Sequence, residues 1–256
     1  MTTVRHLTLP LIIAAFLPAV TFSQSASREV VSQPIEWSSW TNNVKVHKRL
    51  TILTEGQFRF AGQFEPMQFQ FRTAAEVHLT KNLSVVALGY VYTWNPTYGK
   101  QPNQYVNNEH RTWQQVYYKH KIGRVHLTHR GRLEQRHIQV HVTQNGEVID
   151  QGYDLNSNRF RYRFGMSIPF NKHEVGPKTL FANIYDEVFV SWGKPVTYHK
   201  PDQNRVFAGL GYQFNSHFIV TTGFLHQMLV KSNGAKQENN YGVQMNFTYN
   251  LDLTKD

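Results

Sequence analysis

Apolar and polar residues alternate at every second position along much of this chain. The clearest case is residues 159–170, in which aromatic residues such as Phe160 and Tyr162 alternate with Arg161 and Arg163. Successive side chains of a β-strand point to opposite faces, so this segment has an apolar face and an arginine face. No stretch of comparable length has the 3.6-residue period of an amphipathic helix. The pattern therefore predicts an all-β protein.

Eleven segments of the chain alternate in this way. They cover residues 35–46, 50–61, 67–79, 83–94, 108–121, 124–138, 159–170, 179–192, 203–214, 217–230 and 239–251. Two architectures fit the alternation. In a soluble sandwich the apolar face would point inward and the arginines would meet water. In a transmembrane barrel the apolar face meets lipid and the arginines line the lumen.

The connections between segments favour the barrel. Short turns, such as 47–49 and 215–216, alternate along the chain with longer polar loops, such as 95–107 and 139–158. Outer-membrane barrels have short periplasmic turns and long external loops, whereas a sandwich has no reason to sort its loops. The predicted fold is a closed antiparallel transmembrane β-barrel of about 10–12 strands.

The predicted chain has three parts. Arg5 and His6 precede an apolar run and small residues before Gln24, which indicates that residues 1–23 are a secretory signal peptide. Residues 24–34 are expected to be an N-terminal segment in the periplasm or the lumen, and 35–256 the barrel. Since bacterial barrels usually have an even number of strands, residues around Val30 are the alternative source of a short twelfth strand. The predicted location is the outer membrane of a Gram-negative bacterium.

Composition agrees with an exported barrel. The chain of 256 residues has no cysteine, which excludes disulfides and the lipidated cysteine of a lipoprotein. Its mean hydropathy of −0.48 excludes a helical membrane bundle, but a barrel that alternates apolar and polar residues has such a value. The formal net charge is +10. It does not indicate a nucleic-acid partner, because the arginines are expected to be enclosed and no nucleic-acid-binding motif occurs.

Several stretches resemble a known family when they are taken together. They are 111–115 (RTWQQ), 129–136 (HRGRLEQR), 159–163 (RFRYR), 185–189 (YDEVF), and 203–205 (QNR) with Gly209. The chain is similar in these stretches to the uncharacterised bacterial family called domain of unknown function 2490. The resemblance covers nearly all of the chain after the signal peptide. It implies an outer-membrane β-barrel and brings no established activity.

The polar strand faces carry a set of charged residues that we expect to line the lumen. This set is Glu55, Arg59, Arg72, Glu76, Glu109, Arg111, Arg130, Arg132, Glu134, Arg136, Arg159, Arg161, Arg163, Glu187 and Arg205. It holds ten arginines, five glutamates and no lysine. Guanidinium groups are weakly hydrated and bind carboxylates through two hydrogen bonds, which suits a confined lumen.

Two functions follow from this set. The arginine surplus indicates a small, porin-like channel that prefers anions, with a small anionic solute and outer-membrane lipid as partners. Alternatively, arginine–glutamate pairs brace the strands, and a non-conducting structural or binding barrel presents its external loops. The oligomeric state does not follow from the sequence.

Other chemistry is less well supported. His126 and His129 fall on opposite strand faces and cannot bind one ion, so no metal and no cofactor is predicted. A third function, an outer-membrane enzyme that modifies lipid, would need an outward serine–histidine pair. His226 and Thr222 come nearest but lack a serine and a carboxylate, so we assign no catalytic residue and do not predict an enzyme. Tryptophans toward strand ends, Trp37 and Trp113 among them, are expected in interfacial girdles.

Overall fold

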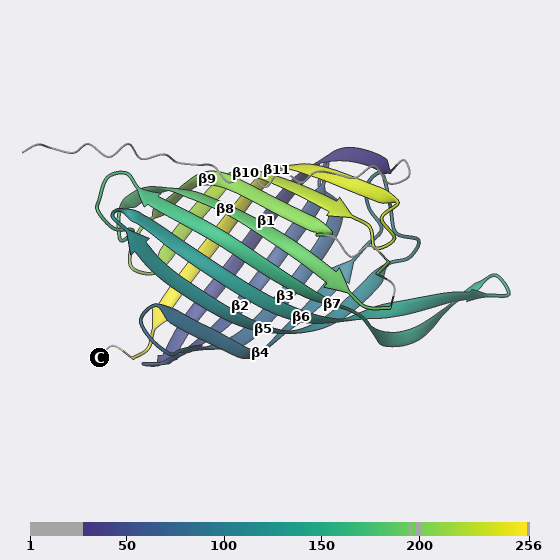
Figure 1. Ribbon diagram of the computed structural model, residues 1–256, viewed down its shortest axis with the longest axis horizontal. Coiled ribbons are helices and arrows are strands. Elements are labelled where there is room, and N and C mark those ends of the chain that lie inside the picture. Colours follow the sequence, from purple (N-terminus) through teal and green to yellow (C-terminus); the bar gives the residue numbers. More distant parts are fainter. Residues whose placement is uncertain (1–27, 195, 198–200, 255–256) are drawn as a thin grey trace, which may run out of the picture.

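A computed structural model describes residues 28–194, 196–197 and 201–254. Within these ranges the chain forms one closed barrel of eleven strands (Figure 1). The strands are β1 (Glu29–His47), β2 (Leu50–Ala61), β3 (Glu65–His78), β4 (Leu83–Asn95), β5 (Asn107–Ile122), β6 (Val125–Gln144), β7 (Glu147–Pro169), β8 (Thr179–Trp192), β9 (Gln203–Gln213), β10 (Phe218–Val230) and β11 (Lys236–Asp252). The predicted all-β closed barrel is confirmed. The predicted signal peptide, residues 1–23, lies outside the described residues.

Ten of the eleven strand pairs are antiparallel, and the barrel closes through a parallel pair, β1 with β11. An odd number of alternating strands leaves the first and last strands pointing the same way. The paired positions run from Glu29 opposite Lys236 to Lys45 opposite Asp252. The described residues 29–34 are therefore part of β1. They form neither a separate segment nor a twelfth strand, which corrects the prediction for this stretch.

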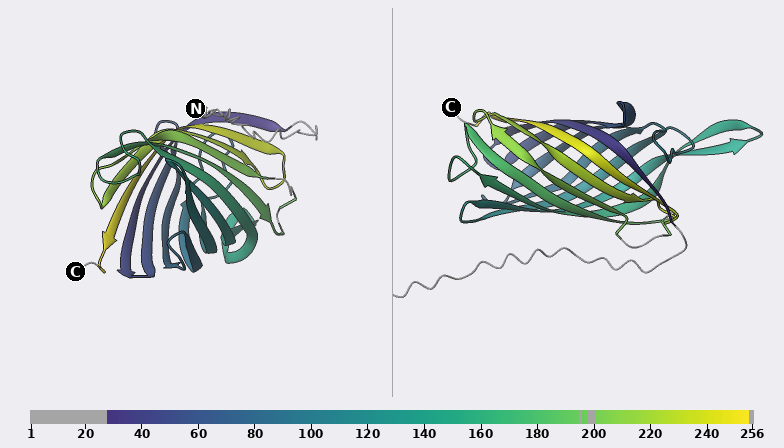
Figure 2. Two further views of the ribbon diagram at one scale, coloured as in Figure 1. Left: turned by 60° about the vertical axis from the view of Figure 1, so that its left-hand side comes forward. Right: turned by 90° about the horizontal axis from the view of Figure 1, so that it is seen from above.

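Successive connections lie at alternate ends of the barrel (Figure 2), and three of the five at one end are five residues or longer, against one of the five at the other. We call one end the short-turn rim, formed by residues 48–49, 79–82, 123–124, 170–178 and 214–217. The other end is the long-loop rim, where the connections include residues 62–64, 96–106, 145–146, 193–194, 196–197, 201–202 and 231–235. No helix with the length and apolar character needed to cross a membrane occurs among the described residues.

The longest predicted loop is a hairpin. Strands β6 and β7 continue beyond the long-loop rim and project well away from the barrel (Figure 1). A two-residue turn joins them, with φ values of 53° at Asn145 and 83° at Gly146. Asn-Gly is the pair that best tolerates positive φ at both turn positions, and such turns match the twist of paired strands. The prediction of a loop over 139–158 was wrong because this turn signal was overlooked.

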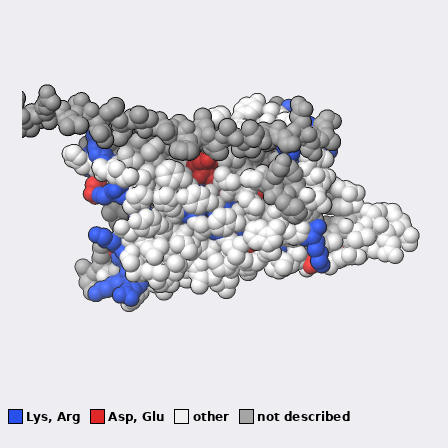
Figure 3. Space-filling model, in the orientation of Figure 1, with Lys and Arg blue, Asp and Glu red and all other residues white. Residues whose placement is uncertain are grey.

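Most strands present apolar side chains outward, and on the face seen in Figure 3 most of the described wall between the rims is uncharged. Two apolar strand residues, Val86 and Met67, face inward instead. Leu88 is 65% exposed, but Val86 is only 2% exposed because a β-bulge shifts the β4–β5 register between Val86 and Gly89. Met67 is also buried, in a cluster with Ile35.

Two tryptophans lie inside the lumen rather than in an interfacial girdle. Trp37 is 6% exposed and Trp113 is fully buried. Gly89 leaves the space for Trp113, since a Cβ atom on Gly89 would lie 2.2 Å from the indole. The Arg132 guanidinium stacks on Trp113, with its carbon 4.1 Å from the ring centroid. Aromatic side chains therefore fill part of the lumen together with the arginines.

Candidate functional site

All fifteen charged residues predicted to line the lumen lie on inward-facing strand positions. Twelve of them form ion pairs, because their strands are neighbours and their registers align: ten make one connected network, and Glu55 with Arg72 makes a separate pair. Those twelve are Glu55, Arg72, Glu109, Arg111, Arg130, Arg132, Glu134, Arg136, Arg159, Arg161, Arg163 and Glu187. Glu76 stands apart and accepts a hydrogen bond from Ser84. The remaining two are Arg59 and Arg205.

Glu187 on β8 is fully buried and holds three arginines. Arg130 and Arg161 donate to its Oε1 over 2.6 and 2.9 Å, and Arg163 donates to Oε2 over 2.7 Å. The three donors come from β6 and β7, and Arg130 and Arg163 are direct cross-strand neighbours. A buried carboxylate with hydrogen bonds to both oxygens stabilises several like charges in a small space.

Glu134 on β6 is the second centre of the network and is also fully buried. Arg159 donates two hydrogen bonds to its Oε2, over 2.6 and 2.9 Å, and Arg161 donates to Oε1 over 2.7 Å. Arg161 therefore bridges both centres. Nitrogens of Arg111 and Arg132 approach Glu134 to 3.5 and 3.9 Å.

Two further carboxylates complete the pairing. Glu109 accepts hydrogen bonds from Arg111 at 2.9 Å and from Arg136 at 2.7 and 3.0 Å. Glu55 accepts one from Arg72 at 2.8 Å. Each of these arginines is on a strand next to, or the same as, its carboxylate, so the pairs brace neighbouring strands of the barrel.

Two main cavities lie in the lumen among the described side chains. The larger has a volume of about 910 Å³ and reaches the short-turn rim, where Lys81 and Lys119 line it. The smaller, about 320 Å³, lies toward the long-loop rim. Arg59, Arg161 and Arg205 line both cavities, so these arginines stand at the boundary between them.

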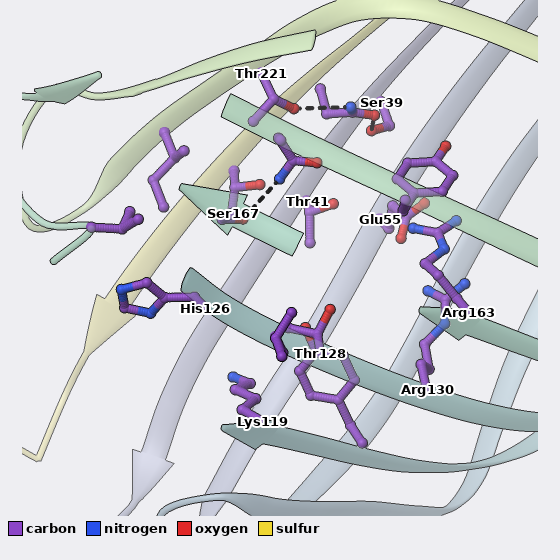
Figure 4. A pocket seen from close by; sticks show the side chains of 18 of the residues that line it. Ser39, Thr41, Glu55, Lys119, His126, Thr128, Arg130, Arg163, Ser167 and Thr221 are labelled. Atoms are coloured by element: carbon purple, nitrogen blue, oxygen red, sulfur yellow. Dashed lines mark hydrogen bonds between the residues drawn. The ribbon is translucent and has the colours of Figure 1, made fainter. Parts of the chain in front are cut away.

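Figure 4 shows the larger cavity, with Arg130 and Arg163 side by side near Glu55 and with hydroxyl side chains such as Thr41 and Thr221 farther along. Its lining thus combines guanidinium groups with neutral hydrogen-bonding groups. Such a lining can solvate and hold an anion.

The loop between β4 and β5 covers the smaller cavity. The Tyr98 hydroxyl donates a hydrogen bond to Glu238 over 3.3 Å, and Glu238 also pairs with Lys231 at 2.7 Å. Burial, and then the nearby Glu238 carboxylate, raise the pKa of the Tyr98 phenol, which therefore stays a neutral donor. Gln101 of the same loop is also buried.

The histidines singled out from the sequence do not come together as a site. His126 lines the larger cavity, whereas His129 faces outward and makes a 2.7 Å hydrogen bond with Tyr162. No group of three or more potential metal ligands occurs in the described part of the chain. His226 lies on the outer face of β10, with Val206 and Tyr241 as its cross-strand neighbours.

Sequence reasoning missed the amide groups of the lumen. Gln57, Gln68 and Gln70 accept hydrogen bonds from the Arg59 guanidinium, the bond to Gln57 being 2.6 Å long. Gln115 accepts two from Arg132, at 3.0 and 2.7 Å. Gln57, Gln68 and Gln70 alternate with glycine or apolar residues, which indicates an inward face, whereas Gln115 follows Gln114 and alternation does not fix its face.

With the lumen described, comparison with known proteins adds one result. The family model for "Protein of unknown function (DUF2490)" matches residues 36–239. The chain belongs to the DUF2490 family. No curated protein and no solved structure matches it significantly. The stretches that carry the DUF2490 resemblance lie on the five consecutive strands β5 to β9, which also supply most of the ion-pair network.

Proposed function

We propose that this DUF2490 member is an outer-membrane barrel whose lumen binds small anions that enter from the short-turn rim. The lateral wall supports a membrane location, because every strand contributes a large apolar side chain that is more than a third exposed. One such residue from each strand, in order, is Trp40, Phe58, Phe71, Leu88, Val116, Leu133, Phe160, Ile184, Leu210, Phe224 and Val243. A continuous exposed apolar surface of this kind needs lipid or protein to cover it.

The orientation follows from the rims. In outer-membrane barrels short turns face the periplasm and long loops face outward. The projecting β6–β7 hairpin would then extend from the cell surface, and the larger cavity would open toward the periplasm.

One observation carries the proposal: the charged lining of the larger cavity is almost all positive. It includes nine cationic side chains and one carboxylate, Glu55. The cations are Arg59, Arg72, Lys81, Lys119, Lys121, Arg130, Arg161, Arg163 and Arg205. A cavity lined by one sign of charge and enclosed by a low-dielectric wall concentrates ions of the opposite sign.

A blind cavity fits the filling of the lumen better than an open pore. Glu134, Glu187 and Phe189 are all fully buried near the middle of the barrel. A barrel of about eight strands is filled by its side chains, and eleven strands leave only moderate extra room.

Fluorescence quenching tests the proposal. Trp37 lines the larger cavity. A variant in which the other four tryptophans are replaced by phenylalanine reports on Trp37 alone. We expect iodide to quench the Trp37 fluorescence much better than caesium, because the cavity lining is mostly positive. This preference should weaken as the salt concentration rises, because about 0.1 M salt screens charges beyond about 10 Å. Equal quenching by both ions, or none by either, would overturn the proposal.

An anion-preferring channel is the second candidate. Arg59, Arg161 and Arg205 line both cavities, so a change in the conformations of these side chains would connect the two cavities into one channel. This observation favours the channel. Single-channel recording in planar bilayers separates the two functions. A channel predicts an anion-selective conductance that falls when Arg161 and Arg163 become glutamine and is unchanged in Lys48→Gln, whose cation lies outside the cavity. If protein that is shown to be folded gives no conductance, the channel is ruled out and the closed, anion-binding cavity is the function that remains.

A further inference from the structure

Two arginines of the lumen have no carboxylate partner among the described residues. The other eight arginines of the predicted set engage Glu55, Glu109, Glu134 and Glu187. Glu187 lies directly opposite Arg205 in the β8–β9 register, but its two oxygens are occupied by arginines of β6 and β7. Arg59 and Arg205 are left with neutral partners.

These two arginines meet on one indole ring. Trp37 is the cross-strand neighbour of Arg59, and the Arg59 guanidinium carbon lies 4.2 Å from the Trp37 ring centroid. The Arg205 guanidinium reaches the same ring from β9, at 4.9 Å. Both arginines are only 7% exposed. Positive charge from two distant parts of the sheet is therefore gathered in one buried place.

Amide oxygens solvate these charges without neutralising them. Arg59 donates to glutamine oxygens of β2 and β3, and Arg205 donates to Gln203 over 2.8 and 2.7 Å when that amide is oriented to accept. A third donor, the Trp37 Nε1–H, is buried and has no hydrogen-bond partner. Buried like charges repel strongly, and an unpaired buried donor is unfavourable. An anion would relieve both at once.

We propose that Trp37, Arg59 and Arg205, hereafter the Trp37 site, bind one oxyanion: a phosphate, sulfate or carboxylate group. This inference rests on the proposed function, since the anion arrives through the larger cavity. Guanidinium groups present parallel N–H donors that match the paired oxygens of such groups, whereas a halide offers no such geometry. The site lies at the boundary between the two cavities, so an anion bound there is the deepest one reachable from the short-turn rim.

Inorganic phosphate is the first probe, and equilibrium dialysis of the folded full-length barrel in neutral detergent measures its binding. We expect one phosphate per barrel, sulfate and acetate competing for the same site, and chloride failing to compete at equal ionic strength. Arg59→Gln and Arg205→Gln should each weaken phosphate binding by about tenfold or more, the usual effect of losing a charge-assisted hydrogen bond. Trp37→Phe, which keeps a ring and removes the N–H, should weaken it less.

Two controls keep the result interpretable. Lys48→Gln removes a rim cation outside the cavity and should bind phosphate like the original chain. Folding of each variant is checked by its heat-dependent shift in gel mobility. Without phosphate, Arg205→Gln should be at least as heat-stable as the original chain, because it relieves repulsion with Arg59.

The outcomes separate this inference from the proposed function. Binding that survives both arginine substitutions, or chloride competing as well as sulfate, overturns the Trp37 site. If iodide reaches Trp37 but phosphate does not bind, the cavity takes up anions and the Trp37 site is wrong. If phosphate binds at Trp37 but iodide is excluded in favour of caesium, the proposed uptake from the rim is wrong.

Discussion

Replacing Glu187 with glutamine should destabilise the barrel strongly. The substitution keeps the side-chain volume but removes the negative charge that three arginines share. Arg161 retains Glu134 as a partner, whereas Arg130 and Arg163 would be left without a carboxylate within the described network. The net positive charge of the lumen would therefore increase in the region where the side chains are most buried.

The magnitude follows from the burial of Glu187, which is 0% exposed. Removing one partner from a buried ion pair destabilises by about 3–5 kcal/mol, whereas an exposed pair contributes no more than about 1 kcal/mol. For a chain of this size about 1 kcal/mol corresponds to roughly 2–4 °C, so the unfolding midpoint should fall by about 6–20 °C.

The assay is the temperature at which the folded, faster-migrating form disappears on a gel. Glu147→Gln, at the exposed turn of the β6–β7 hairpin, is the matched control and should shift the midpoint hardly at all. A second variant, Glu187→Gln with Arg163→Gln, removes one of the unpaired charges and should recover part of the loss. Equal shifts for Glu187→Gln and Glu147→Gln would refute the burial of this carboxylate among arginines.

Three further predictions concern topology, packing and the wall. A cysteine at Asn145 should react with a membrane-impermeant maleimide on intact cells, and one at Asn82 should not. The reverse pattern would mean that the barrel has the opposite orientation in the membrane. Gly242→Ala should lower stability by about 1–3 kcal/mol in urea unfolding, because its Cβ would lie 1.7 Å from a carbonyl oxygen of β1, while Gly176→Ala, with open space around it, should be neutral. Leu88→Lys on the wall should reduce stability in lipid vesicles by about 2–4 kcal/mol, and an unchanged value would argue against lipid contact there.

Much of the fold could be predicted from the alternation alone, because a period of two is local to each strand. The lumenal position of Arg161 and Glu187 followed from it directly. Alternation alone would place Val86 and Met67 on the outer face. Both are buried because separate register shifts, β4–β5 at Val86 and β2–β3 at Met67, reverse the alternation without leaving a signal in residue type. Trp37 was misplaced because a large aromatic residue fits either a girdle or a lumen filled with guanidinium groups.

The pairing inside the lumen was beyond prediction from sequence. Glu187 could be assigned to a strand face, but which arginines reach it depends on the strand register and on side-chain length. Its direct neighbour Arg205 instead contacts Trp37, on the distant strand β1. Contacts across the lumen have no spacing rule in the sequence, so the Trp37 site became visible only in the closed barrel.

The parallel pair β1–β11 also constrains how the barrel folds. Its side-chain contacts join residues more than two hundred positions apart, as in Ser39 with Asn246. Contacts between residues so far apart in sequence form late and slowly. The chain loses conformational entropy when it closes the long loop, and the contacts stabilise the barrel only after that loss. Until β11 is in place, both β1 and the growing sheet expose an unpaired strand edge, which is prone to pair with other chains. Ring closure is therefore expected to be the last and slowest step of folding, and shortening the chain at β11 should leave an open sheet that aggregates.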